Sequence, residues 1–229
     1  MHASADPAHH ASAFDGSAAV RVLQPRRAAP ADAVRPTRAE VNLANLRHNL
    51  RVLERAVAGT SATPPQIWGV LKADAYGHGA PAVARTLERA GVAGVCVALL
   101  EEAIELREAG IRIPILVMGG YYGPRREGLD EIVARRLTPV VYDAAHIERL
   151  AAVARFEGSH PIRVHLKVDT GMGRLGAGPA ELPSVLAALA RSPEVSMDGL
   201  MTHLACADSD DLGDTVEQLA LFARMERHA

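Results

Sequence analysis

The segment IWGVLKADAYGHGA occupies residues 67–80 and carries the clearest indication of the fold. Its first four residues are mostly apolar and lead to a lysine, Lys72, after which a glycine-rich turn contains Tyr76. A short apolar run bounded by turn residues is typical of a buried strand. The pattern therefore predicts a strand at 67–73 with Lys72 near its carboxyl end.

Downstream of this segment, short apolar runs alternate with amphipathic stretches. Further strands are predicted at 94–99, 114–120, 138–143, 163–170 and 197–205. Helices are predicted near 80–90, 100–109, 127–136, 144–156, 179–191 and 214–228, and an earlier one is indicated by the helical spacing of Leu43, Leu46, Leu50 and Leu53. Several strands are apolar on both faces, as in parallel strands covered by helices. The alternation therefore predicts an α/β fold with right-handed crossovers.

Two architectures fit this alternation, the doubly wound sheet and the (β/α)8 barrel. A dinucleotide-binding sheet requires a G-x-G-x-x-G turn after its first strand, and KADAYGHGA lacks the full pattern. In a barrel the chemistry lies at the carboxyl ends of the strands, where Lys72, Arg174 and His203 are predicted to fall. We therefore predict a (β/α)8 TIM barrel, incomplete because about six of its eight units are visible.

The predicted strand at 163–170, RVHLKVDT, places charged side chains on one of its faces. Because side chains alternate across a strand, one face carries Val164, Leu166 and Val168 and the other carries His165, Lys167 and Asp169. The first face should meet the covering helices and the second should point into the barrel. Inward charges are either a solvated rim or a functional network, because an unpaired buried charge is costly. The turn that follows, DTGMGRLG, holds Arg174, whose guanidinium can donate to an anion.

The composition argues against several classes of function. The chain has 229 residues, of which 48% are hydrophobic, 23% charged and 3% aromatic, with a net charge of −2. These values argue against nucleic acid or an anionic membrane as a partner. Two distant cysteines without metal-ligand spacing indicate free thiols in a reducing compartment, and no metal site is predicted.

The N-terminal residues 1–36 differ from the rest of the chain. They are rich in Ala, Pro, Ser and His, have no apolar periodicity and lack the apolar run of a secretory signal. Such a segment cannot bury enough surface to offset its ordering entropy. We therefore predict a disordered tail at 1–36 and a barrel domain at 37–229.

The residues alone leave two interpretations of Lys72 open. Lysines desolvated at a barrel mouth become nucleophilic amines. Such amines form Schiff bases with carbonyl groups, including that of pyridoxal phosphate. A lysine that extends its ammonium group into solvent is the more common case.

Three segments resemble motifs of the bacterial alanine racemase family. VLKADAYGHGA resembles the family's cofactor-lysine motif, HLKVDTGMGRLG its second motif and GLMTHLACAD its third, and the resemblance covers roughly residues 38–228. The family consists of homodimers whose subunits join a pyridoxal-phosphate-binding barrel to a β-rich domain. The resemblance implies a cytoplasmic isomerase that uses pyridoxal 5'-phosphate to interconvert L- and D-alanine and supplies D-alanine for cell-wall peptidoglycan.

The resemblance also implies roles for individual residues. Lys72 would bind the cofactor covalently and act as the base on the D-alanine face. Tyr76 would hydrogen-bond the cofactor phosphate, and Arg174 would contact the cofactor's phenolic oxygen. Lys167 matches a lysine that is carbamylated in many members. His203 would lie in the catalytic network next to a second base, unless it is only a hydrogen-bonded barrel histidine.

Other features of the family are expected to lie outside this sequence. In the family the second base is a tyrosine from the partner subunit's β-rich domain, and no segment up to Ala229 matches that domain. We therefore expect a partial barrel, truncated on its C-terminal side, that racemises alanine poorly by itself. Two alternatives stay open: a barrel-only protein of pyridoxal-phosphate binding and homeostasis, and an amino-acid racemase of broader specificity that also takes serine.

Overall fold

The computed structural model describes residues 39–59, 61–120, 127–157 and 160–229. The tail predicted at 1–36 lies outside these ranges. Contacts divide the chain into two compact units, Met1–Pro64 and Pro65–Ala229. In the first unit, helix α1 spans Leu43–Val57, and the Asn42 side chain caps it by accepting hydrogen bonds from two backbone N–H groups of its first turn. This confirms the helix predicted from the leucine spacing.

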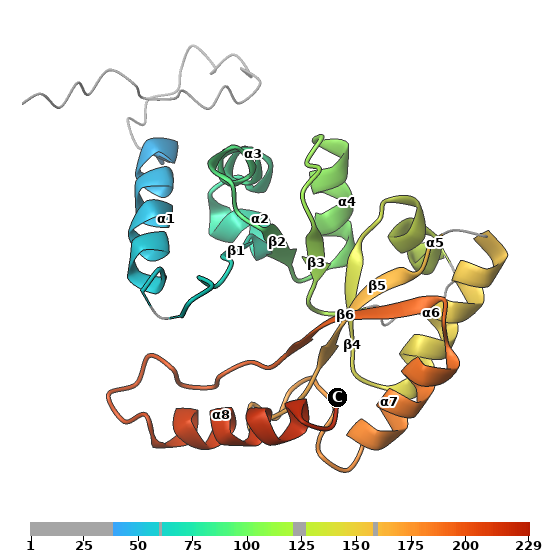
Figure 1. Cartoon of the computed structure of the whole chain (residues 1–229). Helices are drawn as coiled ribbons and strands as arrows, with labels where there is room; N and C mark the ends of the chain where they lie inside the picture. Colours follow the sequence, from blue (N-terminus) through green and yellow to red (C-terminus); the bar gives the residue numbers. More distant parts are fainter. Residues whose placement is uncertain (1–38, 60, 121–126, 158–159) are drawn as a thin grey trace, which may run out of the picture. The chain divides into compact units, whose positions relative to one another are not determined.

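The second unit is built on one parallel sheet of six strands, which follow one another in colour order in Figure 1. The strands are β1 (Trp68–Val70), β2 (Gly94–Val97), β3 (Ile115–Val117), β4 (Thr138–Val141), β5 (Ile162–Lys167) and β6 (Val195–Met201). Each strand pairs in parallel with its neighbours in chain order. This sequential order is the order of a (β/α)8 barrel and confirms the predicted α/β class.

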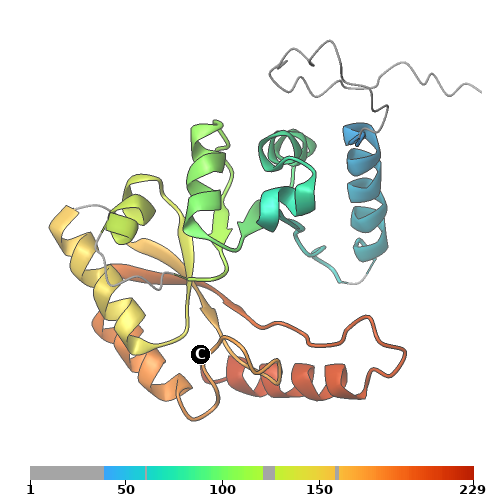
Figure 2. The same ribbon diagram turned by 180° about the vertical axis from the view of Figure 1, so that it is seen from behind.

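At least one helix follows each strand, and most of the helices between strands cover one face of the sheet. They are α2 (Lys72–Gly77), α3 (Ala80–Ala90), α4 (Leu100–Glu108), α5 (Glu127–Ala134), α6 (Ala144–Glu157), α7 (Leu182–Arg191) and α8 (Gly213–Glu226). Figure 2 shows α6 and α7 side by side, and these two helices are in contact. The strand residues Val95, Val97, Val164 and Leu166 are each 0% exposed. Removing such side chains from water stabilises the packing of helices on the sheet.

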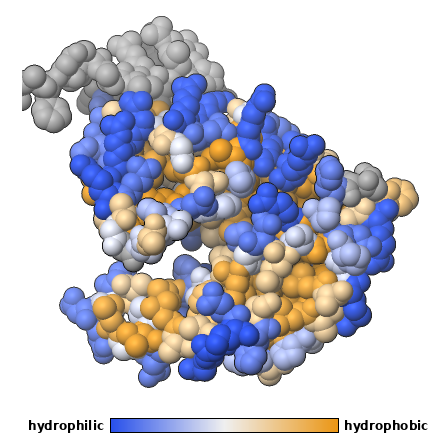
Figure 3. Space-filling view, in the orientation of Figure 1, coloured by the Kyte–Doolittle hydropathy of each residue, from blue (hydrophilic) through white to orange (hydrophobic). Residues whose placement is uncertain are grey.

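The other face of the sheet carries a second apolar cluster. Cys96, Leu116 and Val140 are buried in it, and Trp68, Met118, Tyr142 and Met201 pack against them. Figure 3 shows hydrophobic residues (orange) in the middle of the view and hydrophilic ones (blue) over much of the outer helices. Burial raises the pKa of the Cys96 thiol to about 11, so Cys96 acts as a packing residue.

All six strands end a few residues earlier than the sequence predicts, and two of these differences concern residues of the predicted site. β1 stops at Val70 instead of continuing to residue 73, because the chain turns sharply from Lys72 onward. β6 stops at Met201 instead of residue 205. There the Thr202 hydroxyl donates to the Val168 carbonyl at 3.0 Å, a side-chain bond at the end of the strand ladder. Lys72, the first residue of α2, and His203, on the loop after β6, therefore lie just beyond the strand ends.

Candidate functional site

Lys72 begins a left-handed turn that the sequence analysis did not predict. In α2, the four residues from Ala73 to Tyr76 all have positive φ, between 53° and 56°. An L-residue in this conformation costs about 1–2 kcal/mol, and such strain persists only where the surroundings fix it. One such contact is made by the Asp74 carboxylate, which accepts a hydrogen bond from the Ala80 N–H at 2.6 Å. Contacts with residues outside the turn therefore help to hold its shape.

The turn places the amine of Lys72 beside the ring of Tyr76. The Lys72 Nζ lies 5.8 Å from the centroid of that ring, within the range of a cation–π interaction. Lys72 is half-buried, whereas Tyr76 is 58% exposed. The amine and the phenol are therefore both available to a ligand near the carboxyl end of β1.

β5 shows the alternation of faces that the sequence predicts. Val164, Leu166 and Val168 are each 0% exposed. On the opposite face, His165 packs near Trp68, with 5.9 Å between the ring centroids. The polar residues of β5 therefore belong to the same inner face as the second apolar cluster.

Lys167 is a buried lysine at the end of β5, with only 5% of its surface exposed. Burial lowers the pKa of its ammonium group, and the nearby charge of Arg174 lowers it further. The Asp169 carboxylate opposes both effects but does not cancel them. A neutral amine is therefore easier to form at Lys167 than at an exposed lysine.

Asp169 holds together the glycine-rich turn that carries Arg174. Its carboxylate accepts hydrogen bonds from the N–H groups of Gly171 (2.9 Å) and Gly173 (3.0 Å). Burial raises the pKa of Asp169, but these backbone donors outweigh burial and lower the pKa below its usual value. Gly176 completes the turn with φ of 131°, and Arg174 is exposed on it.

His203 is largely exposed on the loop after β6. Its remaining burial lowers the pKa of the imidazole, and the positive charges of Lys167, Arg174 and Lys72 lower it further. These four side chains, which we call the cationic cluster, lie at or just beyond the carboxyl ends of β1, β5 and β6. With Tyr76 beside Lys72, the structure brings all five predicted site residues to the carboxyl ends of the strands. Cations here can bind an anion, and a lysine amine can attack an aldehyde.

A buried glutamine that the sequence analysis missed ties together the loops of the cationic cluster. Gln218, on α8, is 4% exposed. Its Nε2 donates to the Thr170 hydroxyl (3.3 Å) and to the His203 carbonyl (3.1 Å), and its Oε1 accepts from the Ala205 N–H (2.9 Å). The Gln218 side chain therefore joins the loop after β5 to the loop after β6. The only sequence signal is a polar residue at a position of α8 that helical spacing assigns to its buried face.

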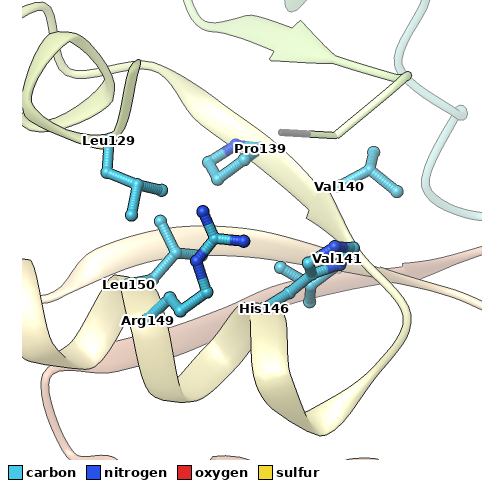
Figure 4. Close-up of a pocket in the computed structure, with 7 residues that line it drawn as sticks. All are labelled: Leu129, Pro139, Val140, Val141, His146, Arg149 and Leu150. Carbon is cyan, nitrogen blue, oxygen red and sulfur yellow. The ribbon is translucent and has the colours of Figure 1, made fainter. Parts of the chain in front are cut away.

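Two cavities lie outside the cationic cluster. One of about 10 Å³ lies between β4 and α6 and is lined by the residues labelled in Figure 4. The other, of about 380 Å³, lies near the amino ends of β3, β4 and β5, and its lining includes Arg107, Arg112, Arg136 and Arg163. Neither cavity is lined by a member of the cationic cluster.

The residues that the structure describes contain neither a metal-binding cluster nor a helix fit to span a membrane. Among them, no group of three or more His, Cys, Asp or Glu side chains is arranged to hold a metal ion. None of the helices in the same ranges combines the length and apolar character needed to cross a bilayer.

Comparison with known sequences shows that the chain is similar to alanine racemases. The family model for "Alanine racemase, N-terminal domain" matches residues 41–229. An alanine racemase of Sorangium cellulosum (strain So ce56) is 74% identical over 196 residues, which cover 86% of this chain and 51% of that protein. An alanine racemase of Xylella fastidiosa (strain 9a5c) is 43% identical over 191 residues, which cover 83% of this chain and 49% of that protein. The chain thus spans about half the length of the curated relatives it matches.

Solved structures show the same likeness in three dimensions. The alanine racemase of Clostridium difficile 630 matches with a TM-score of 0.70 and 32% identity, over 79% of this chain and 49% of that one. The alanine racemase of Streptomyces coelicolor A3(2) matches with a TM-score of 0.70 and 35% identity, over 81% of this chain and 48% of that one. The six βα units therefore share the fold of these proteins, as the predicted barrel requires.

Proposed function

Because the chain belongs to the alanine racemase family, we propose that it forms the pyridoxal-phosphate-binding part of an alanine racemase. The observation that carries this proposal is the position of Lys72. Its amine lies beside the Tyr76 ring, and its positive charge, like those of Lys167 and Arg174, lowers the pKa of His203. An amine among cations fits a cofactor with an aldehyde, a phosphate and a phenolic oxygen. When bound, pyridoxal phosphate supplies a sink for the electrons left when the substrate loses its α-proton.

Each residue of the site has a proposed role. Lys72 holds the cofactor through its amine and moves the proton at the substrate α-carbon on one face. The exposed hydroxyl of Tyr76 donates to the cofactor phosphate, and the exposed guanidinium of Arg174 donates to the phenolic oxygen. His203 lies in the network beside the base of the opposite face, since racemisation needs a base on each face.

The proposal extends to the whole protein through the family resemblance. Alanine is the proposed substrate because the relatives are named alanine racemases. We further propose that the protein works in the cytoplasm as a homodimer and supplies D-alanine for peptidoglycan. The predicted division into a tail at 1–36 and a barrel domain at 37–229 is part of the same proposal.

We expect Lys167 to form a carbamate with dissolved carbon dioxide. The reaction consumes a neutral amine, which burial beside Arg174 favours, and the resulting anion can pair with Arg174. Because the pKa of Lys167 lies below the ordinary lysine value of 10.5, the carbamate should appear in a pH range where exposed lysines stay protonated. At a fixed concentration of dissolved carbon dioxide, its fraction should rise with pH through that lowered pKa.

Carbon NMR with isotope-labelled bicarbonate measures this carbamate. The matched control is Lys167→Met, which keeps an unbranched side chain one atom shorter and removes the amine. An identical carbamate signal in the Lys167→Met variant, or no signal at any pH in the unsubstituted chain, would contradict the modification.

The proposed function is tested by incubating the chain with pyridoxal phosphate and each enantiomer of alanine in deuterated water. We expect exchange of the α-hydrogen that depends on Lys72 and is faster for D-alanine, because Lys72 is proposed to serve that face. Proton NMR and chiral chromatography follow exchange and inversion. Cofactor binding without exchange from either enantiomer would favour the barrel-only protein of pyridoxal-phosphate binding and homeostasis. Faster exchange of serine would favour the amino-acid racemase of broader specificity.

A further inference from the structure

The carboxylate of Glu102, on α4, accepts three backbone hydrogen bonds from two separate loops. Its Oε2 accepts from the N–H groups of Ala98 (2.8 Å) and Leu99 (3.0 Å), which lie between β2 and α4. Its Oε1 accepts from the N–H of Ala73 at 2.6 Å. Ala73 directly follows Lys72, so one carboxylate joins the loop after β2 to the loop that carries the proposed cofactor lysine.

Ala73 is the residue at which the left-handed conformation begins, with φ of 53°. Alanine ordinarily adopts the right-handed region, so this conformation needs support from outside the turn. A charge-assisted hydrogen bond at the Ala73 N–H stabilises the backbone orientation that points it at Glu102. On the other side of Lys72, the Leu71 N–H donates to the Cys96 carbonyl at 2.7 Å. The backbone of Lys72 is thus held from both sides, by β2 and by Glu102.

We propose that Glu102 is a positioning residue for Lys72. By accepting the hydrogen bond from the Ala73 N–H, Glu102 keeps the turn left-handed and holds the Lys72 amine at the site. The link to the cofactor rests on the proposed function of Lys72, whereas the effect on the backbone does not. The competing explanation is that Glu102 only caps α4. The bonds from Ala98 and Leu99 to Oε2 would suffice for such a cap. The bond from Ala73 to Oε1 connects Glu102 to the site.

Two variants of Glu102 separate these explanations. Glu102→Gln has nearly the same shape but only one accepting oxygen, so it cannot serve Ala73 and the start of α4 together. Glu102→Ala removes both acceptors. The control is Glu101→Gln, which makes the same change of charge at the preceding, exposed residue of the same helical turn.

The first measurement is amide hydrogen exchange of residues 73–76 and of α4 in the absence of cofactor. The second is the rate at which pyridoxal phosphate becomes attached to Lys72 in a form that borohydride fixes. We expect Glu102→Ala to raise exchange in the turn by roughly ten- to hundredfold, the loss of one hydrogen bond to a charged group. Attachment to Lys72 should slow by a similar factor. Glu102→Gln should have a smaller effect of the same sign, and Glu101→Gln should have none.

The proposal is overturned if Glu102→Ala changes exchange only in α4, which is the result expected of a simple cap. It is also overturned if the turn opens but attachment to Lys72 proceeds at the original rate. A failure of the unsubstituted chain to attach the cofactor at all would contradict the role of Lys72 instead. The exchange measurement keeps the two failures distinct because it does not involve the cofactor.

Discussion

Replacing Lys72 with alanine is expected to abolish covalent attachment of pyridoxal phosphate and to slow α-hydrogen exchange of alanine by at least about 10²-fold. The chain has only two lysines, Lys72 and Lys167. Lys167 is 5% exposed, so it cannot replace the half-buried Lys72 without a rearrangement of β5. The mass of the intact protein after borohydride reduction measures attachment, and proton NMR in deuterated water measures exchange.

Two further variants control this experiment. Lys72→Arg keeps the positive charge but has no amine that can lose its proton. This variant should therefore bind pyridoxal phosphate without covalent attachment. Lys167→Met removes the other lysine and should leave attachment at Lys72 in place. Attachment that survives in Lys72→Ala would show that Lys72 does not bind the cofactor.

Replacing Gly176 with alanine is expected to lower the free energy of unfolding by roughly 2–5 kcal/mol, through strain and overlap combined. A Cβ at this position would lie 2.6 Å from the Asp169 nitrogen and 2.7 Å from the Val168 carbonyl carbon, and φ is 131°. These are backbone atoms, which cannot move aside as a flexible side chain can. Because the same turn carries Arg174, cofactor affinity should fall together with Tm. Thermal unfolding and cofactor titration measure the two effects.

Gly173 offers a matched control within the same turn. It also has positive φ, 68°, but a Cβ there would meet nothing within 4 Å. Gly173→Ala should therefore cost only the conformational strain, about 1–2 kcal/mol. Equal losses of stability in the two variants would show that the close approach at Gly176 has no energetic consequence.

The strands and their order follow from features that a sequence carries locally. In β5 the alternation of apolar and polar residues predicted which side chains are buried, and Val164 and Leu166 are indeed fully covered. The left-handed turn after Lys72 could not be predicted in this way. Alanines at 73 and 75 favour right-handed backbone, and the support for the observed conformation includes Glu102, 29 positions further along the chain.

The supporting residues of the site were likewise not predicted from the sequence. A polar helix residue such as Glu102 ordinarily indicates a solvated face. Gln218 gives only the weak signal of a polar residue at a position on the buried face of α8. Their importance comes from the backbone groups they reach, which belong to other loops and depend on how α8 and α4 pack. The positions of Lys72, Lys167 and Arg174 near strand ends were predictable, because each follows or ends a recognisable strand within a long motif.

The most direct test of the central claim is to load the chain with pyridoxal phosphate, reduce it with borohydride, digest it and locate the pyridoxyl group by mass spectrometry. Because the chain has only two lysine side chains, the pyridoxyl group can be assigned to one or the other. We predict the group on the peptide that contains Lys72, with Lys167 unmodified. A pyridoxyl group on Lys167, with Lys72 unmodified, would contradict the account.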